Sequence, residues 1–119
     1  MDSASVIFVG QNEPIFIVAV YLIGNENKTA FKIGYTMGPV SSRLKQLQTG
    51  HHENLKIYAI AEVRNSTRVE KMMHGRYAHK KLNGEWFELN EKEIESFIKN
   101  CTDADEAVNF MRGMGNPWV

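Results

Sequence analysis

The chain has 119 residues and a formal net charge of zero, with 14 basic and 14 acidic side chains. This length fits one domain that buries a core without metal or disulfide staples. The charge balance gives no overall sign of a polyanion partner, and the single cysteine excludes an internal disulfide. The apolar run 15–23 is too short to span a bilayer and lacks a signal-peptide pattern, so we expect a soluble, intracellular protein in the cytoplasm or nucleus of the host cell.

The first part of the chain predicts a hairpin of two strands. Residues 1–14 combine a short apolar patch with turn-forming residues, and we expect an N-terminal arm or an extra edge strand there. Ile15–Ile23 is dense in β-branched and aromatic residues without polar alternation, as in a central strand covered on both faces. After a turn at 24–28, Ala30–Thr36 forms the second strand.

A helix and a third strand follow the hairpin. Either Ser41 or Ser42 can cap a short helix that runs through about Gln48. Leu55–Val63 alternates well enough to predict a third strand, with its odd-numbered residues from Ile57 onward on one side.

The next segment predicts a second helix with separate functional and packing faces. Its start is indicated by the polar residues 65–67, and it is expected to end near His79. Helical spacing at i, i+4, i+7 and i+11 places four residues on one face: Glu70, His74, Tyr77 and Lys81.

The C-terminal part is expected to be helical after a short extended segment. Glu85–Leu89 is predicted as a strand or extended stretch, and Asn90 can cap a helix with Glu93 at its third position. A break is expected at 102–103, followed by a final helix through Met111.

Cys101 lies at apolar helical spacing with Ile94, Phe97 and Ile98, which indicates a buried structural thiol. We expect a single domain over residues 15–112, including the C-terminal helices, and a tail over 113–119.

Charge is distributed unevenly along the chain. Residues 64–81 carry six basic side chains and one acid, whereas residues 85–106 carry eight acids and two lysines. The first segment could therefore attract a nucleic-acid backbone, although mixed charges on helices commonly serve solubility alone. The candidates for nucleic-acid binding are Arg68, Lys71, Arg76, Lys80 and Lys81.

Four residues spread over these elements form a chemically coherent set. Tyr21 offers a hydroxyl, and Lys32 and Arg43 offer fixed positive charge for a phosphate. Glu70 offers an oxygen ligand for a hard divalent cation. Residue types in this order can hold a metal-assisted phosphodiester site.

The motifs around these residues resemble the GIY-YIG nuclease superfamily. They are Val20-Tyr21-Leu22, Lys32-Ile33-Gly34, Arg43, Glu70 with His74, and Gly84-Glu85-Trp86-Phe87. The chain is more closely similar to the bacteriophage-type branch described as a DNA-binding domain, whose second motif commonly reads KIG. This resemblance covers about residues 15–89. It implies an α+β fold with a three-stranded antiparallel sheet flanked by helices, to which a C-terminal helical extension is added.

The resemblance also implies roles for individual residues. Tyr21 corresponds to the first-motif tyrosine, Arg43 to the phosphate-binding arginine, and Glu70 to the glutamate that binds Mg²⁺ or Mn²⁺. Tyr21 could orient or deprotonate a water if nearby positive charge lowers its pKa, and His74 could relay a proton or hold a phosphate. Lys32 stands where the enzymes of the superfamily have a second tyrosine, and it is expected to add electrostatic stabilisation.

The late asparagine of the superfamily has two possible counterparts, Asn83 and Asn90. The residues together favour a metal-dependent endonuclease of phage or viral type, with DNA as the expected substrate. One alternative is a non-catalytic nucleic-acid-binding module of the same fold, and the replacement at Lys32 favours it. A second alternative is a small protein-interaction domain. A homodimer or a protein partner could supply specificity that so small a chain lacks.

Overall fold

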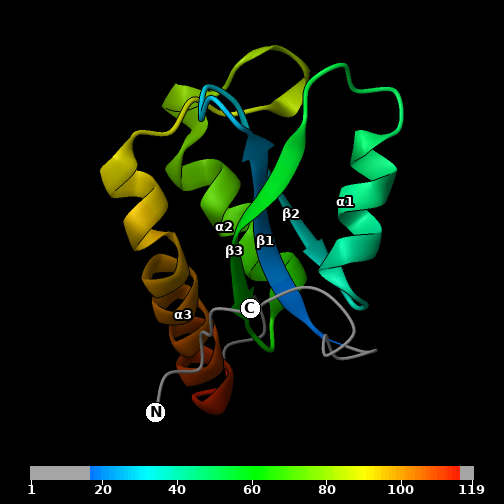
Figure 1. The fold of residues 1–119 in the computed structure, drawn as a ribbon. Coiled ribbons are helices and arrows are strands. Elements are labelled where there is room, and N and C mark those ends of the chain that lie inside the picture. The colour runs from blue at the N-terminus through cyan, green and yellow to red at the C-terminus, as the bar shows by residue number, and fades with distance from the viewer. Residues whose placement is uncertain (1–16, 116–119) are drawn as a thin grey trace.

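The structure is a computed structural model that describes residues 17–115. Its elements in chain order are β1 (Ala19–Asn25), β2 (Phe31–Thr36), α1 (Val40–Gln48), β3 (Leu55–Glu62), α2 (Ser66–Arg76), the 3₁₀ turns η1 (Ala78–Lys80) and η2 (Asn83–Glu85), and α3 (Glu91–Gly113). The three strands form one antiparallel sheet in the order β2-β1-β3. The predicted α+β fold with a C-terminal helix is therefore confirmed (Figure 1).

The central strand β1 is covered on both faces, as its unbroken apolar pattern predicts. Val20 and Leu22 pack in the core that α2 and α3 close, whereas Tyr21 and Ile23 pack on the side of α1 (Figure 1). The sheet is thus the middle of three layers, and its two faces carry different side chains.

The bounds of β1 differ from the predicted ones. The strand begins at Ala19 and continues through Asn25, which was predicted to lie in the turn. The Oδ1 atom of Asn25 accepts hydrogen bonds from the backbone N–H groups of Thr29 and Ala30, so this buried side chain ends the strand and closes the turn. The predicted N-terminal arm 1–14 and the tail residues 116–119 lie outside the described residues.

A register shift in β3 overturns the predicted placement of Ile57. Leu22 pairs with Ala59 but Ile23 pairs with Ile57, so Tyr58 is an extra residue in a β-bulge. Ile57 consequently packs on the α1 side, while Ala59 and the following odd-numbered residues pack on the other side. Simple alternation cannot anticipate such a reversal, because the bulge changes the phase of the strand.

The helix starts differ from the predicted caps. α1 begins at Val40 after Pro39, so Ser41 and Ser42 lie inside its first turn and neither is the cap residue. Val40 is fully buried against the sheet, and this packing fixes the first turn of the helix on the sheet. β3 ends one residue earlier than predicted, at Glu62.

α2 is shorter than predicted and its faces differ. It ends at Arg76, and Tyr77 is a buried core residue whose hydroxyl accepts a hydrogen bond from Asn100. Lys81 lies beyond the helix, after η1. The predicted four-residue face is therefore wrong for Tyr77 and Lys81. Tyr77 is buried in the core, and α2 ends before either residue.

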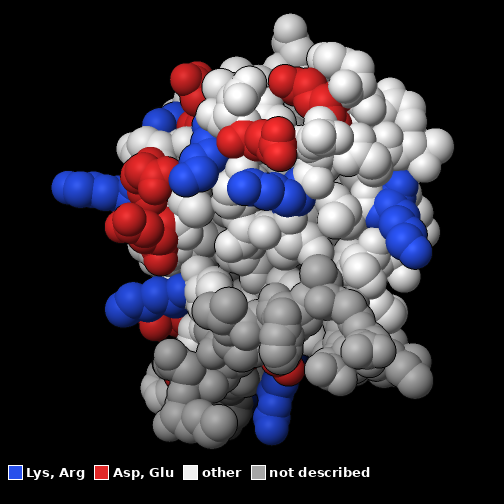
Figure 2. Space-filling model, in the orientation of Figure 1, with Lys and Arg blue, Asp and Glu red and all other residues white. Residues whose placement is uncertain are grey.

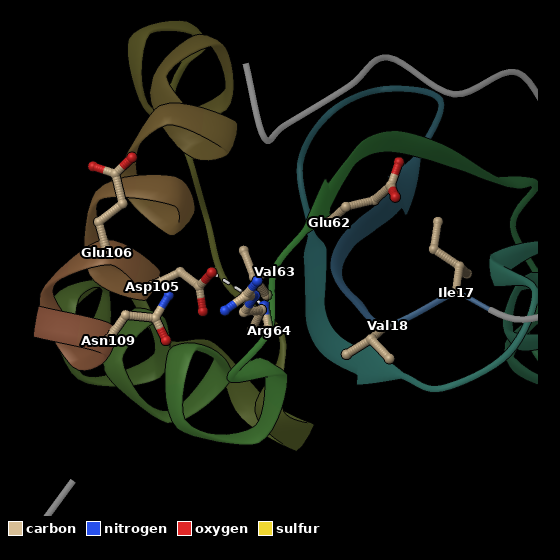
Figure 3. A pocket seen from close by; sticks show the side chains of 8 residues that line it. All are labelled: Ile17, Val18, Glu62, Val63, Arg64, Asp105, Glu106 and Asn109. Atoms are coloured by element: carbon tan, nitrogen blue, oxygen red, sulfur yellow. Dashed lines mark hydrogen bonds between the residues drawn. The ribbon is translucent and has the colours of Figure 1, made fainter. Parts of the chain in front are cut away.

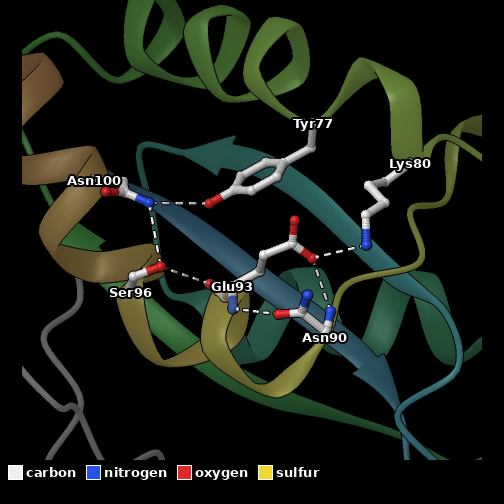
Figure 4. Close-up of polar contacts among 6 residues, drawn as sticks. All are labelled: Tyr77, Lys80, Asn90, Glu93, Ser96 and Asn100. Carbon is white, nitrogen blue, oxygen red and sulfur yellow. Dashed lines mark hydrogen bonds and ion pairs between the residues drawn. The ribbon is translucent and has the colours of Figure 1, made fainter.

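α3 begins with the predicted capping box. Asn90 accepts a hydrogen bond from the N–H of Glu93, whose carboxylate accepts one from the N–H of Asn90 and also binds Lys80 at 3.2 Å (Figure 4). The same carboxylate thus ties the start of α3 to the segment that follows α2.

The expected break at 102–103 does not occur, and α3 is continuous. Its buried stripe runs on from Cys101 to Ala104 and Val108, so packing outweighs the weak local preference of Thr and Asp for a helix end. Cys101 is buried as predicted, and burial raises the pKa of its thiol to about 12.

The start of α2 is held by a residue of α3 that is distant in sequence. Asp105, which is buried, accepts a hydrogen bond from the backbone N–H of Arg64 at 3.1 Å (Figure 3). It accepts another from the backbone N–H of Asn65 at 2.8 Å. Asn65 itself makes no cap to α2, and its Nδ2 atom binds Asp105 at 2.7 Å. This tertiary contact fixes the two residues that precede α2.

We predict that Asp105→Ala lowers the free energy of unfolding by about 3 kcal/mol, because it leaves buried backbone donors without an acceptor. Urea unfolding of this variant beside Glu106→Ala, the exposed neighbour, measures the effect. Equal midpoints for the two variants would contradict the role of Asp105.

Candidate functional site

The site is organised by the contact between Tyr21 and Gly34. The two residues are partners in the β1–β2 register. Tyr21 is 5% exposed, and a Cβ atom added at Gly34 would lie 2.3 Å from its hydroxyl oxygen. Only a residue without a side chain leaves room for the phenol ring to lie across β2 at this point. Packing of the Tyr21 ring therefore explains why the third residue of the Lys32-Ile33-Gly34 motif is glycine.

The outer edge of β2 is closed by groups from the second half of the chain. Phe31 exchanges two backbone hydrogen bonds of 2.8 Å with Phe87, which identifies the predicted extended segment as a short continuation of the sheet. Ile33 lies two residues further along β2, so its carbonyl faces the same edge. That carbonyl is bound by Nε2 of His74 at 2.9 Å.

His74 positions Glu70 at this edge. Because a carbonyl only accepts hydrogen bonds, Nε2 of His74 carries the proton in this contact. The same atom lies 3.7 Å from Oε2 of Glu70, one helical turn earlier, and the His74 ring packs edge-on against Phe87. Glu70 and His74 thus share one side of α2, as predicted, and Glu70 keeps 21% of its side chain exposed.

The charges of two predicted residues, Arg43 and Glu70, act on the phenol of a third, Tyr21. Burial raises the pKa of Tyr21 above its ordinary value of 10.0, the positive charge of Arg43 lowers it, and the negative charge of Glu70 raises it. The net direction is upward. Arg43 acts in the expected direction, but burial outweighs it, so the pKa of Tyr21 is not lowered overall. At neutral pH the phenol is protonated and can donate a hydrogen bond.

The two remaining cations lie near this centre on different elements. Lys32 is half-buried and pairs with Ile23, so it shares the sheet face of Tyr21, two residues before Gly34. Arg43 is exposed on α1, and its Nη1 atom donates to Oε1 of Gln46 at 3.0 Å. Sequence positions 21, 32, 43 and 70 are thus brought to one region by the sheet and its two flanking helices.

The predicted nucleic-acid-binding residues lie elsewhere on α2 and after it. Arg68 and Lys71 line a groove against Val108 and Met111 of α3, and Arg76 lines a neighbouring hollow. Lys80 is in an ion pair with Glu93, and Lys81 is exposed.

On the face shown in Figure 2, basic and acidic side chains are interspersed. The role of these five residues in binding nucleic acid stays a prediction.

A hollow of about 590 Å³ lies beside the start of β1 and the Asp105 contact. The residues around it are Ile17, Val18, Glu62, Val63, Arg64, Asp105, Glu106 and Asn109 (Figure 3). None of the predicted catalytic residues lines it. Its position marks the junction between β3 and α3, away from Tyr21.

Within residues 17–115, no three His, Cys, Asp or Glu side chains converge as a metal-binding group. Glu70 is therefore the carboxylate to test as a metal ligand, because its oxygens are hard donors that remain partly accessible at the edge of β2. Mg²⁺ fits such a site, since it usually retains several waters and takes one or two protein carboxylates. His74 is not available through Nε2, which donates to Ile33.

The fold and this site define a small α+β domain with a polar centre at the β2 edge of its sheet. A sequence profile of the T5orf172 domain family matches residues 18–102. The chain belongs to this family, which is phage-associated and related to nucleic acids. No curated protein and no solved structure matches the chain. In the described part of the chain, no helix is both long and apolar enough to cross a membrane.

We predict that Gly34→Ala displaces the Tyr21 ring and lowers the free energy of unfolding by about 1–3 kcal/mol, as overpacking does. Gly38→Ala is the matched control, because nothing lies within 4 Å of a Cβ atom added there. Urea unfolding compares the two variants with the parent chain. If Gly34→Ala were as stable as Gly38→Ala, the steric account would be wrong.

The raised pKa of Tyr21 predicts a pH dependence of stability. Between the ordinary value of 10.0 and the higher folded value, the unfolded chain ionises this phenol while the folded chain does not. The stabilisation is therefore complete below about pH 10 and is lost as pH rises through the folded pKa. Unfolding free energies of the parent and of Tyr21→Phe, measured from pH 8 upward, should converge or cross in that range. A constant difference would refute the shift.

Proposed function

We propose that this chain is a divalent-metal-dependent endonuclease with a GIY-YIG-like site that hydrolyses phosphodiester bonds, with DNA as the expected substrate. The observation that carries the proposal is that the Tyr21 phenol lies across Gly34 of the Lys32-Ile33-Gly34 motif, where the charges of both Arg43 and Glu70 act on it. A guanidinium can bind the phosphate, a carboxylate can hold a metal ion and a phenol can orient the water, which are functions that a metal-assisted phosphodiester site uses. Membership of a nucleic-acid-related family supports the same substrate class.

Each residue has a distinct role in the proposed reaction. Arg43 binds a non-bridging phosphate oxygen with its planar guanidinium, and its exposed position allows it to reach substrate. Tyr21 is protonated at neutral pH and orients the attacking water by a hydrogen bond, which is the first of the two roles expected for it. Lys32 adds positive charge on the same face of the sheet.

Glu70 is the residue that would hold Mg²⁺ or Mn²⁺, and a bound divalent cation supplies charge stabilisation at the phosphoryl oxygens. His74 acts as a positioning residue. Its Nε2–H group donates to the carbonyl of Ile33, and the same nitrogen lies beside Glu70. The imidazole therefore limits where the carboxylate can move. This role differs from the expected proton relay, which would need a free Nε2.

We predict that Glu70→Gln lowers cleavage by at least about 100-fold, because the neutral amide is a poor ligand for a hard cation. The assay incubates labelled duplex, single-stranded and branched DNA, and RNA, with Mg²⁺ or Mn²⁺ and with EDTA. Glu88→Gln, at an exposed acid outside the site, is the matched control. Cleavage that survives Glu70→Gln would refute the assigned metal ligand.

A second candidate function is binding of nucleic acid without cleavage. The observation that favours it is Lys32 at the second-motif position, since an ammonium binds phosphate but does not replace the chemistry of a phenol. In that case the parent chain and Glu70→Gln retain the same oligonucleotides equally, and neither cleaves in either metal. Lack of any salt-dependent retention would instead favour the protein-interaction domain.

A further inference from the structure

Three aromatic rings lie together beside the proposed site. The rings of His51 and His52 are stacked, with centroids 5.3 Å apart and an interplanar angle of 6°. The His51 ring lies 5.1 Å from the Trp86 ring at 44°. His52 is exposed, whereas His51 and Trp86 are half-buried. We call these three residues the aromatic ledge.

The loop that carries the two histidines is held by a set of hydrogen bonds. The Nε2 group of Gln48 donates to the carbonyls of His51 and Glu53, and its Oε1 accepts from the N–H of Leu55. The N–H of Glu53 donates to Nδ1 of His51 at 3.2 Å. A loop held in this way loses little further entropy when it binds a ligand.

Trp86 is placed on the same face of the sheet as the candidate site. Phe87 pairs with Phe31 and packs on the α2 side, whereas Trp86 packs on the α1 side with Tyr21 and its neighbours. The segment therefore presents its two consecutive aromatic residues to opposite faces, as extended backbone does.

Lys32 connects the ledge to the proposed phosphate site. It follows Phe31, the partner of Phe87, and pairs with Ile23, which lies two residues along β1 from Tyr21. Two residues of a strand span about 7 Å, which is close to two stacked base steps of about 3.4 Å. A short nucleic-acid strand can thus run from Tyr21 to the aromatic ledge, with one of its phosphates near Lys32.

We propose that the aromatic ledge stacks an unpaired nucleobase of the bound strand, one or two nucleotides from the phosphate at Tyr21. Every base has a flat π-face that stacks on aromatic side chains, and a base inside a duplex has both faces occupied by its neighbours. The substrate class is therefore nucleic acid with an unpaired or extruded nucleotide, such as a single strand or a branched end. This inference rests on the proposed function for its location, but stacking itself needs no cleavage.

The test uses the full chain with an oligothymidylate of about ten nucleotides and a fully paired duplex of equal length, in EDTA so that cleavage does not interfere. His52→Ala is expected to weaken binding of the single strand by at least about fivefold, the lower end of base–aromatic stacking. His52→Phe should restore binding, because the phenyl ring also stacks. Asn54→Ala, an exposed change in the same loop, should leave it unaltered.

A second measurement avoids any change to the ledge. In a Trp118→Phe background, Trp86 is the single tryptophan, and its fluorescence should be quenched by the oligothymidylate but not by the duplex. Equal affinities for His52→Ala, His52→Phe and the parent, or no quenching at saturation, would overturn the proposal. A parent chain that stacks the single strand but cleaves nothing would refute the nuclease and leave the ledge intact. Cleavage without stacking would refute the ledge and leave the nuclease proposal intact.

Discussion

The packing of the Tyr21 ring on Gly34 is the constraint on which the site depends. The ring is almost fully buried, yet it must place a hydroxyl near Arg43 and Glu70. Crossing β2 where the strand has no side chain satisfies both requirements. The same burial raises the pKa of the phenol further above neutrality, so the geometry that forms the site also keeps the hydroxyl protonated to higher pH.

The edge of β2 combines stability with chemistry. An open strand edge has unpaired backbone groups that favour aggregation, and here Phe87 and His74 bind them. His74 uses its Nε2 proton for this contact and simultaneously lies beside Glu70. A residue that protects the fold therefore also positions the proposed metal ligand. The segment after η2 has a similar double role, since Phe87 closes the edge while Trp86 enters the opposite face.

Several features could be predicted from local pattern because their causes are local. The unbroken apolar run predicts a central strand, and Asn90 with Glu93 predicts the capping box of α3. Helical spacing correctly groups Glu70 with His74. Other predictions failed where a distant contact outweighed the local one. The bulge at Tyr58 reversed the face of Ile57, the core buried Tyr77, and Asp105 of α3 fixed the residues that precede α2.

The candidate site divides in the same way. The sequence by itself determined which chemical groups are present and their order, because residue types and motif spacing are covalent properties of the chain. Only the tertiary structure decided that the pKa of Tyr21 is raised, that His74 donates to Ile33, and that Trp86 joins His51 and His52. These outcomes depend on burial and on contacts between segments far apart in the chain, and neither is encoded in the spacing of any one motif.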